Sequence, residues 1–268
     1  MTSKTIIALL LCIAPALLVV VFATAPVSDA NASDFARPPE VVGTPQVTES
    51  HYVYIPVVQR AVWVAAPLQN GDFEAGWWRE TFTGEEYNEL FVPEGWIAFW
   101  REGWPYGRPE MKIIPNEYPY LNPARVYTGQ QALGWFTFYR SGDAGVYQQM
   151  PATHGSIYKA KAFAHVWYSQ LDDAHLSEWV DEDGITHTIR SGDPGMDVML
   201  GLDPTGGTNP WAPTVVWTRT SIYDQFGSLE VQATAQALSV TLFLRAEALY
   251  PFKHCDAYWD NVSLEVLH

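Results

Sequence analysis

The chain has 268 residues, of which 48% are hydrophobic, and its formal net charge is -15. A chain of this length fits one large domain, whose core buries about 70% of the unfolded surface. A protein this acidic has little positive charge with which to neutralise phosphates. We therefore expect no nucleic-acid partner.

The N-terminus carries the first recognisable segment. Lys4 precedes an apolar run over residues 6–22, and small residues follow, with cleavage sites after Ala30 or Ala32. This order is typical of a secretory signal peptide, although the run is also long enough for an uncleaved membrane anchor. We expect residues 1–30 to be a signal peptide and the protein to be secreted or held at the cell surface, with no membrane contact after cleavage. Cleavage would leave Cys255 as the single cysteine, which excludes a disulfide within the chain.

Residues 31–65 separate the signal segment from the main domain. Prolines at positions 38, 39 and 45 stand among polar residues, which indicates a flexible linker. A short apolar, β-prone segment follows at residues 51–60. We expect the main domain to begin at Ala66 and to cover residues 66–268.

The main domain is predicted to be all-β. Short runs rich in β-branched and aromatic residues lie between Gly, Pro and Asp turns, and no helical period is present. We expect strands at residues 68–74, 95–100, 131–139, 145–150, 157–168, 196–202, 214–217, 229–233, 238–245 and 257–266. Many short strands without helices predict a β-sandwich.

The final run, residues 257–266, alternates with a period of two. This pattern places Tyr258, Asp260 and Val262 on one buried face. A buried carboxylate is costly unless a cation or hydrogen-bond donors compensate it. Residues 68–74 carry two more carboxylates, Asp72 and Glu74. If the first and last strands pair, these groups meet and suit a metal ion near the two ends of the domain.

Five short motifs, in this order, resemble the CenC-type carbohydrate-binding modules, which are galactose-binding-like jelly rolls. They are Asn70-Gly-Asp-Phe-Glu74, Pro93-Glu-Gly-Trp96, Val126-Tyr-Thr-Gly-Gln-Gln-Ala-Leu133, Gly145-Val-Tyr-Gln-Gln149 and Trp259-Asp-Asn-Val-Ser-Leu264. Residues 201–210 and 253–254 also resemble secreted proteins of this architecture from Chloroflexi-like bacteria. The resemblance implies a jelly-roll β-sandwich that binds a polysaccharide or glycan. The acidic loop at residues 172–193 and the long N-terminal region depart from the compact module.

The same resemblance implies a structural Ca²⁺ ion. Carried over to this chain, Glu74 and Asp260 supply carboxylates, and backbone oxygens near Tyr127 and Gln130 complete the shell, with Asp72 as a further candidate. Ca²⁺ takes six to eight oxygen ligands and mixes carboxylates with carbonyls, which suits this set. The alternative is that Asp260 accepts backbone N–H groups and Glu74 is solvated.

Two strands carry aromatic rows that suit a sugar ligand. Phe163, His165 and Trp167 lie opposite the small, core-facing residues of the strand at 157–168, and Phe243 and Arg245 lie opposite the apolar row of the strand at 238–245. If both strands belong to the concave sheet, their outward rows form one groove. Aromatic planes pack on the C–H faces of sugars, and Arg and His bind hydroxyl groups. Trp104 and Tyr106 would form a wall of this groove; the alternative is that the N-terminal extension or a partner domain covers it.

Catalysis finds little support in the sequence, and we assign no catalytic residue. A glycosidase needs two carboxylates, about 5–5.5 Å apart for retention or 6.5–9.5 Å apart for inversion. The candidates are Glu110, Glu85, Glu86, Glu89 and the pair Asp172 and Asp173, and Glu110, which lies between apolar runs, is the strongest of them. No G-x-S-x-G or H-E-x-x-H motif is present. The sequence therefore favours a secreted, non-catalytic carbohydrate-binding protein. The alternatives are a structural or adhesive cell-surface protein and a glycoside hydrolase on a jelly-roll fold.

Overall fold

The computed structural model describes residues 62–79, 90–116, 124–171, 178–181, 183–190, 192–193 and 195–267. The expected signal peptide and the β-prone segment at residues 51–60 lie outside this part of the chain. Within it, no helix has the length and apolar character needed to span a bilayer.

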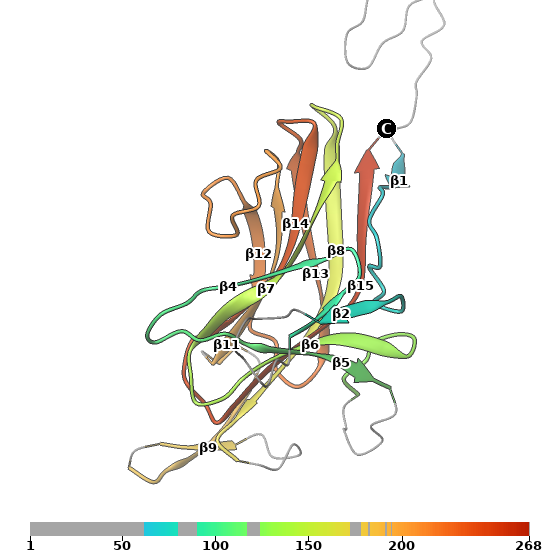
Figure 1. Ribbon diagram of the computed structural model, residues 1–268. Coiled ribbons are helices and arrows are strands. Elements are labelled where there is room, and N and C mark those ends of the chain that lie inside the picture. Colours follow the sequence, from blue (N-terminus) through green and yellow to red (C-terminus); the bar gives the residue numbers. More distant parts are fainter. Residues whose placement is uncertain are drawn as a thin grey trace, which may run out of the picture. The chain divides into compact units, whose positions relative to one another are not determined.

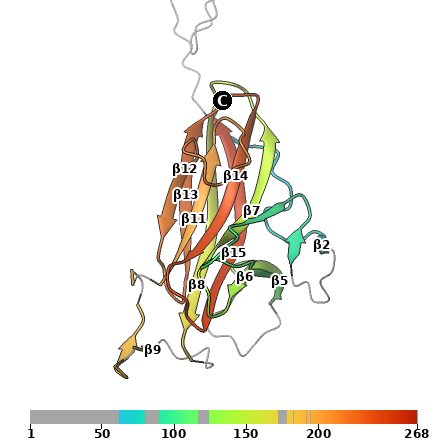
Figure 2. The same ribbon diagram turned by 60° about the vertical axis from the view of Figure 1, so that its left-hand side comes forward.

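Two antiparallel sheets form the sandwich (Figures 1 and 2). The six-stranded sheet has the order β13 (Phe226–Thr234), β8 (Ile157–Ser169), β15 (His254–Leu267), β6 (Gln131–Thr137) and β5 (Glu110–Pro115), and β1 (Trp63–Ala65) pairs with the end of β15. The five-stranded sheet has the order β12 (Val216–Thr220), β11 (Met196–Asp203), β14 (Ser239–Ala248), β7 (Gly142–Pro151) and β4 (Ile97–Trp100). Two hairpins, β2 (Trp77–Arg79) with β3 (Phe91–Pro93) and β9 (Glu178–Val180) with β10 (Thr186–Thr188), complete the described strands. The chain passes repeatedly from one sheet to the other, as from β6 to β7 to β8, and the fold is the predicted all-β jelly-roll sandwich.

The core lies between the two sheets and is built from the alternate residues of each strand. Ala160, Ala162 and Ala164 on β8 are fully buried, as are Leu242 and Leu244 on β14. Because successive side chains of a strand point to opposite faces, the intervening residues of both strands lie on the outer faces of the sandwich. This arrangement decides which of the predicted site residues can meet.

A β-bulge in β15 overturns the alternation predicted for the last strand. The pairing of β15 with β8 shifts between Asp260 and Ser263, and Asn261 has a φ of 47°. An extra residue in a bulge moves the following side chains to the other face. Trp259 therefore packs in the main core before the bulge and Val262 packs there after it, whereas Tyr258 joins a separate cluster on the outer face.

The stretch at residues 68–74 is not a strand, contrary to prediction. Two of its residues, Asn70 and Phe73, have positive φ values of 48° and 60°, so the chain turns there instead of extending. The two ends of the domain nevertheless lie side by side, because the backbone N–H of Val262 donates to Gly71 O at 2.7 Å. β1 also pairs with β15, so residues 63–65, which the sequence placed in the linker, belong to the sandwich.

Candidate functional site

The predicted groove does not form, because β8 and β14 belong to different sheets. Phe163, His165 and Trp167 lie on the outer face of the six-stranded sheet, whereas Phe243 and Arg245 lie on the outer face of the five-stranded sheet. The inner rows of both strands lie in the core between the two sheets, so their outer rows point to opposite sides of the sandwich and cannot line one groove.

The outward row of β8 is also covered. His165 is fully buried and Trp167 is 5% exposed. Burial, with a smaller contribution from the nearby Arg125, lowers the pKa of His165 to about 2. The neutral imidazole therefore accepts a hydrogen bond from Arg125 Nη1 through Nε2, at 2.8 Å. Phe163 stacks on Tyr127 with a centroid distance of 3.8 Å, so this row takes part in packing.

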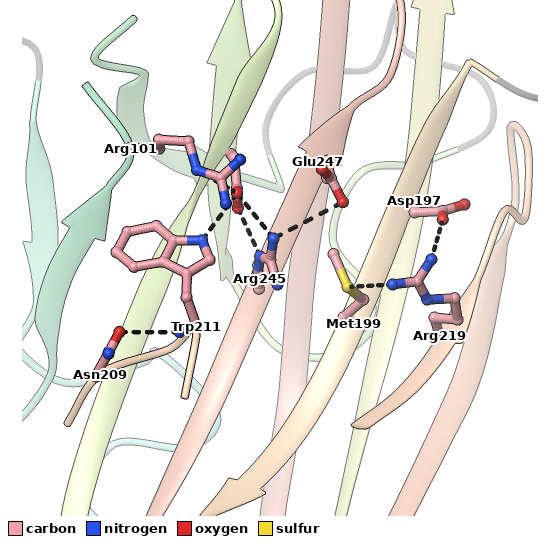
Figure 3. Close-up of polar contacts among 9 residues, drawn as sticks. Arg101, Asp197, Met199, Asn209, Trp211, Arg219, Arg245 and Glu247 are labelled. Atoms are coloured by element: carbon pink, nitrogen blue, oxygen red, sulfur yellow. Dashed lines mark hydrogen bonds and ion pairs between the residues drawn. The ribbon is translucent and has the colours of Figure 1, made fainter. Parts of the chain in front are cut away.

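The outer face of the five-stranded sheet carries a polar network instead. The strand register aligns Asp143, Glu247 and Asp197 in one row across β7, β14 and β11. The adjacent row contains Arg245 on β14 and Arg219 on β12. Neighbouring rows therefore place carboxylates beside guanidinium groups, as Figure 3 shows.

Asp143 is the centre of this network, and its side chain is fully buried. Its Oδ2 atom accepts hydrogen bonds from Arg245 Nη2 at 2.8 Å and from Trp211 Nε1 at 2.9 Å, and Arg101 Nε lies 3.4 Å from the same oxygen. Arg245 Nε donates to the other oxygen, Oδ1. We call these four residues the Asp143 network. Two guanidinium groups compensate one buried carboxylate, which would be strongly destabilising if left unpaired.

Three aromatic residues, which we call the aromatic rim, accompany this network: Trp104, Tyr106 and Trp211. The Arg101 guanidinium lies over the rings of Tyr106, 4.8 Å from the centroid, and Trp211, at 5.5 Å. Trp211 is 38% exposed and meets Phe99 edge-on at 5.9 Å. Trp104 is 97% exposed and occupies a turn closed by the hydrogen bond from Tyr106 N to Gly103 O.

The loop at residues 204–215 carries Trp211 and is fastened to the sheet. Asp203, fully buried at the end of β11, accepts hydrogen bonds from Thr205 N, Thr205 Oγ1 and Thr214 Oγ1 at 2.7–2.8 Å. Gln149 on β7 donates to Gly206 O at 2.6 Å. Val215 at the end of the loop packs in a cluster with Phe243, which is fully buried. Phe243 therefore supports the loop and is not open to a ligand, contrary to prediction.

Of the predicted ligand-binding residues, Tyr106 and Arg245 are brought together around Arg101 and Asp143, and Trp104 shares the turn with Tyr106. Arg101, Asp143 and Trp211 were missed. Asp143 follows a glycine in what looked like a turn between strands, and Trp211 lies in a stretch whose Gly, Pro and Asn residues indicated only a loop. The aromatic side chain at position 211 was the one available signal.

The candidate metal residues gather at the turn formed by residues 127–131. Asp260 Oδ2 accepts hydrogen bonds from Tyr127 N and Thr128 N, both at 2.8 Å. Glu74 Oε1 accepts from Gln130 N at 2.6 Å and from Gln131 N at 3.0 Å. Burial raises the pKa of Asp260 to about 6, and the negative charge of Glu74 adds to this effect, although backbone donors oppose it.

Carboxylate oxygens are of the donor type that Ca²⁺ takes. Two carboxylates act on one turn, and no Lys or Arg ion pair with either is present in the described part of the chain. Asp72 lies beside them, where its Oδ1 accepts from Glu74 N at 3.4 Å. The described residues contain no group of three or more His, Cys, Asp or Glu side chains placed to hold a metal, so backbone oxygens would have to complete the shell, which Ca²⁺ accepts. The turn also donates backbone N–H groups to the carboxylates of Glu74 and Asp260. This is the arrangement that the metal-free alternative predicts for Asp260.

Glu110 lies away from the aromatic rim. It is on β5, in the six-stranded sheet, where its Oε2 pairs with Lys112 Nζ at 2.9 Å. The strand register places Asp256 on β15 in the same row as Glu110, with Phe136 on β6 between them. Neither carboxylate shares a face with the Asp143 network.

Comparison with protein-family models found no match, and comparison with curated proteins found none either. Among solved structures, the chain is similar to a Stig cyclase, Fisc, from Fischerella sp. TAU, with 15% identity, a TM-score of 0.46, and coverage of 76% of this chain and 98% of that one. It is similar to the arabinose-bound α-L-arabinofuranosidase MgGH51, with 14% identity, a TM-score of 0.42, and coverage of 75% of this chain and 26% of that one. It is also similar to TmCBM61 in complex with β-1,4-galactotriose, with 14% identity, a TM-score of 0.41, and coverage of 74% of this chain and 95% of that one.

Proposed function

We propose that this protein is a secreted, non-catalytic carbohydrate-binding protein, and that a polysaccharide or glycan binds at the aromatic rim. The observation that carries the proposal is the exposed Trp211 beside the Arg101 guanidinium, with a second exposed tryptophan, Trp104, in the turn that carries Tyr106. An almost fully exposed tryptophan is unusual in a soluble protein and marks an interaction site. Aromatic rings pack on the C–H faces of sugars, while guanidinium N–H groups donate to ring and hydroxyl oxygens.

The way in which Trp211 is held supports a binding role. Its Nε1 donates to Asp143 and its ring rests against Phe99, so both ends of the indole have partners before any ligand arrives. Side chains ordered in advance lose less conformational entropy on binding. Asp143 itself is committed to two guanidinium groups and an indole, which favours a supporting function for this carboxylate over proton transfer to a substrate.

An adhesive or structural role is the second candidate, because an exposed tryptophan such as Trp104 also suits a protein partner. The two candidates predict different partners for the same residues. A panel of soluble polysaccharides that all fail to bind, together with a defined oligomer in solution, would favour the adhesive role.

We also propose that Ca²⁺ is a structural ligand of this protein. Glu74 and Asp260 would supply carboxylates, and backbone oxygens near Tyr127 and Gln130 would supply neutral ligands, with Asp72 close by. When bound, the ion would neutralise the two carboxylates and link the two ends of the domain through the turn at residues 127–131.

Affinity electrophoresis against a panel of polysaccharides tests the glycan proposal. We expect retarded migration of the wild type and loss of retardation in Trp211→Ala and Trp104→Ala. The matched control is Trp78→Ala, because Trp78 is exposed to the same extent as Trp211, 38%, but lies on the β2–β3 hairpin outside the rim. Equal retardation of all three variants would remove the rim from the site, and absence of retardation of the wild type would contradict glycan binding.

A further inference from the structure

We propose that Asp143 is the positioning residue of the rim, because one buried carboxylate fixes two loops so that they meet a ligand as one unit. The inference rests on the proposed function, since it concerns how that site is held. It goes beyond that function by assigning the geometry of the site to a residue that no ligand touches.

The two loops come from distant parts of the chain. Arg101 and Tyr106 follow β4, whereas Trp211 lies in the loop between β11 and β12. Asp143 on β7 lies between them and contacts both Arg101 and Trp211. The backbone strengthens the link to the first loop, because Arg101 N donates to Asp143 O at 2.8 Å.

A single oxygen atom makes both contacts. Trp211 Nε1 and Arg101 Nε lie 2.9 Å and 3.4 Å from Asp143 Oδ2. Arg245 Nη2 also donates to Oδ2, and Arg245 Nε donates to Oδ1, so the carboxylate cannot rotate without losing several partners. The position of each loop therefore depends on the same buried group.

The charge of Asp143 matters as much as its shape. Hydrogen bonds to a charged acceptor are about twice as strong as those between neutral groups. An asparagine would offer one oxygen and one NH₂ group to partners that are all donors, so it would turn at least one contact into a donor facing a donor. The amide oxygen would take the Oδ2 position, which has three of the four contacts, so Asp143→Asn should weaken the hydrogen bond from Trp211 and remove the charge attraction to Arg101 while leaving the size of the side chain unchanged.

A double-mutant cycle tests this inference. Trp211→Phe keeps an aromatic ring but removes the N–H donor to Asp143, and we expect it to weaken glycan binding about tenfold. In the Asp143→Asn background the same substitution should weaken binding clearly less, because a neutral amide oxygen already makes a weaker hydrogen bond to the indole. Trp78→Phe is the matched control: Trp78 is exposed to the same extent as Trp211, 38%, but lies on the β2–β3 hairpin outside the rim, so its effect should be small and equal in both backgrounds.

Equal and additive losses for Trp211→Phe in both backgrounds would overturn the inference, because the indole N–H would then act independently of Asp143. If Asp143→Asn does not fold, the comparison of Trp211→Phe with Trp78→Phe in the wild-type background decides, and equal effects overturn it.

A readout without a ligand separates this inference from the proposed function. In protein labelled with fluorotryptophan, the ¹⁹F resonance of Trp211 can be identified by its loss in Trp211→Phe. We expect this resonance to be sharp in the wild type and shifted or broadened in Asp143→Asn, with other tryptophan resonances unchanged. An unchanged Trp211 resonance would contradict positioning by Asp143, whereas failure of the wild type to bind any glycan would contradict the proposed function alone.

Discussion

Replacing Asp256 with asparagine should make the stability of this protein much less dependent on pH. Asp256 is buried on the outer face of the six-stranded sheet, where its Oδ2 accepts a hydrogen bond from Tyr258 Oη at 2.9 Å. Its Oδ1 has no hydrogen-bond partner among the described residues. Burial raises the pKa of this carboxyl from 3.8 to about 7, although Tyr258, Arg125 and Lys112 oppose the shift.

The sign and size of the effect follow from this difference in pKa. The folded protein binds the proton more tightly than the unfolded chain, so ionisation of Asp256 opposes folding. Below pH 3.8 both states are protonated and the group has no effect. Between pH 3.8 and about 7 the free energy of unfolding falls as pH rises, by about 1.4 kcal/mol per pH unit, which gives a total loss of about 4 kcal/mol above pH 7. This loss is a large part of a typical stability of about 5–15 kcal/mol.

Urea unfolding at pH 5, 6, 7 and 8, with EDTA present throughout, measures the effect. Asp260, whose pKa is also raised, contributes with the same sign, so the informative quantity is the difference between wild type and variant at each pH. We expect Asp256→Asn to gain stability relative to the wild type from pH 5 to pH 8. Asp183→Asn, at an exposed position on the β9–β10 hairpin, is the control and should parallel the wild type. Parallel profiles for wild type and Asp256→Asn would refute the reasoning.

Three further predictions concern the Ca²⁺ site, Trp167 from the predicted groove that does not form, and the turn at residues 127–131. Millimolar Ca²⁺ should stabilise the protein by about 4 kcal/mol if the site has micromolar affinity. Thermal unfolding with Ca²⁺ or with EDTA measures this as a shift in melting temperature. A shift of the same size in Asp260→Asn would contradict the assignment. Trp167→Ala should lower the free energy of unfolding by about 3–5 kcal/mol, because a buried indole is lost, but should not change glycan affinity below the melting temperature. Weaker glycan binding with unchanged stability would show instead that Trp167 belongs to the binding site. Gly129→Ala should destabilise by roughly 1–3 kcal/mol, because its new Cβ would lie 2.2 Å from Glu74 Oε1 at a φ of 72°. Gly155→Ala, with a φ of 85° and no atom within 4 Å of the new Cβ, measures backbone strain alone, and an equal loss in both variants would exclude the clash with Glu74.

Most long strands could be predicted because their alternation is strong and local. The expected strand at 157–168 matches β8 (Ile157–Ser169), and the one at 238–245 matches the first part of β14 (Ser239–Ala248). β5 was missed, because Glu110 and Lys112 break the apolar pattern and Pro115 looks like a turn. The strand predicted at 68–74 was wrong for the opposite reason. Its apolar residue Phe73 is fully buried in the core, as expected of a strand, but the backbone there forms turns instead of an extended strand.

The site was less accessible to sequence reasoning than the strands. Arg245 and Asp143 are separated by 102 positions in the chain yet form the strongest contacts of the network. Their alignment depends on how β14 pairs with β7, and no local pattern specifies which strands become neighbours. Tyr106 and Trp104 were recognisable because aromatic residues in a polar loop are unusual by themselves.

The amino-acid order alone determined that this protein is all-β, and which rows of β8 and β14 face the core; in β15 the bulge reversed the row that was predicted before it. Both properties follow from a period of two, which a strand expresses without reference to the rest of the chain. The tertiary structure alone decided which outward rows share a face, because membership of a sheet is set by backbone hydrogen bonds between distant segments. The aromatic rows of β8 and β14 have the same local pattern, and they lie on opposite outer faces because the two strands belong to different sheets and turn their small and aliphatic rows into the core between them.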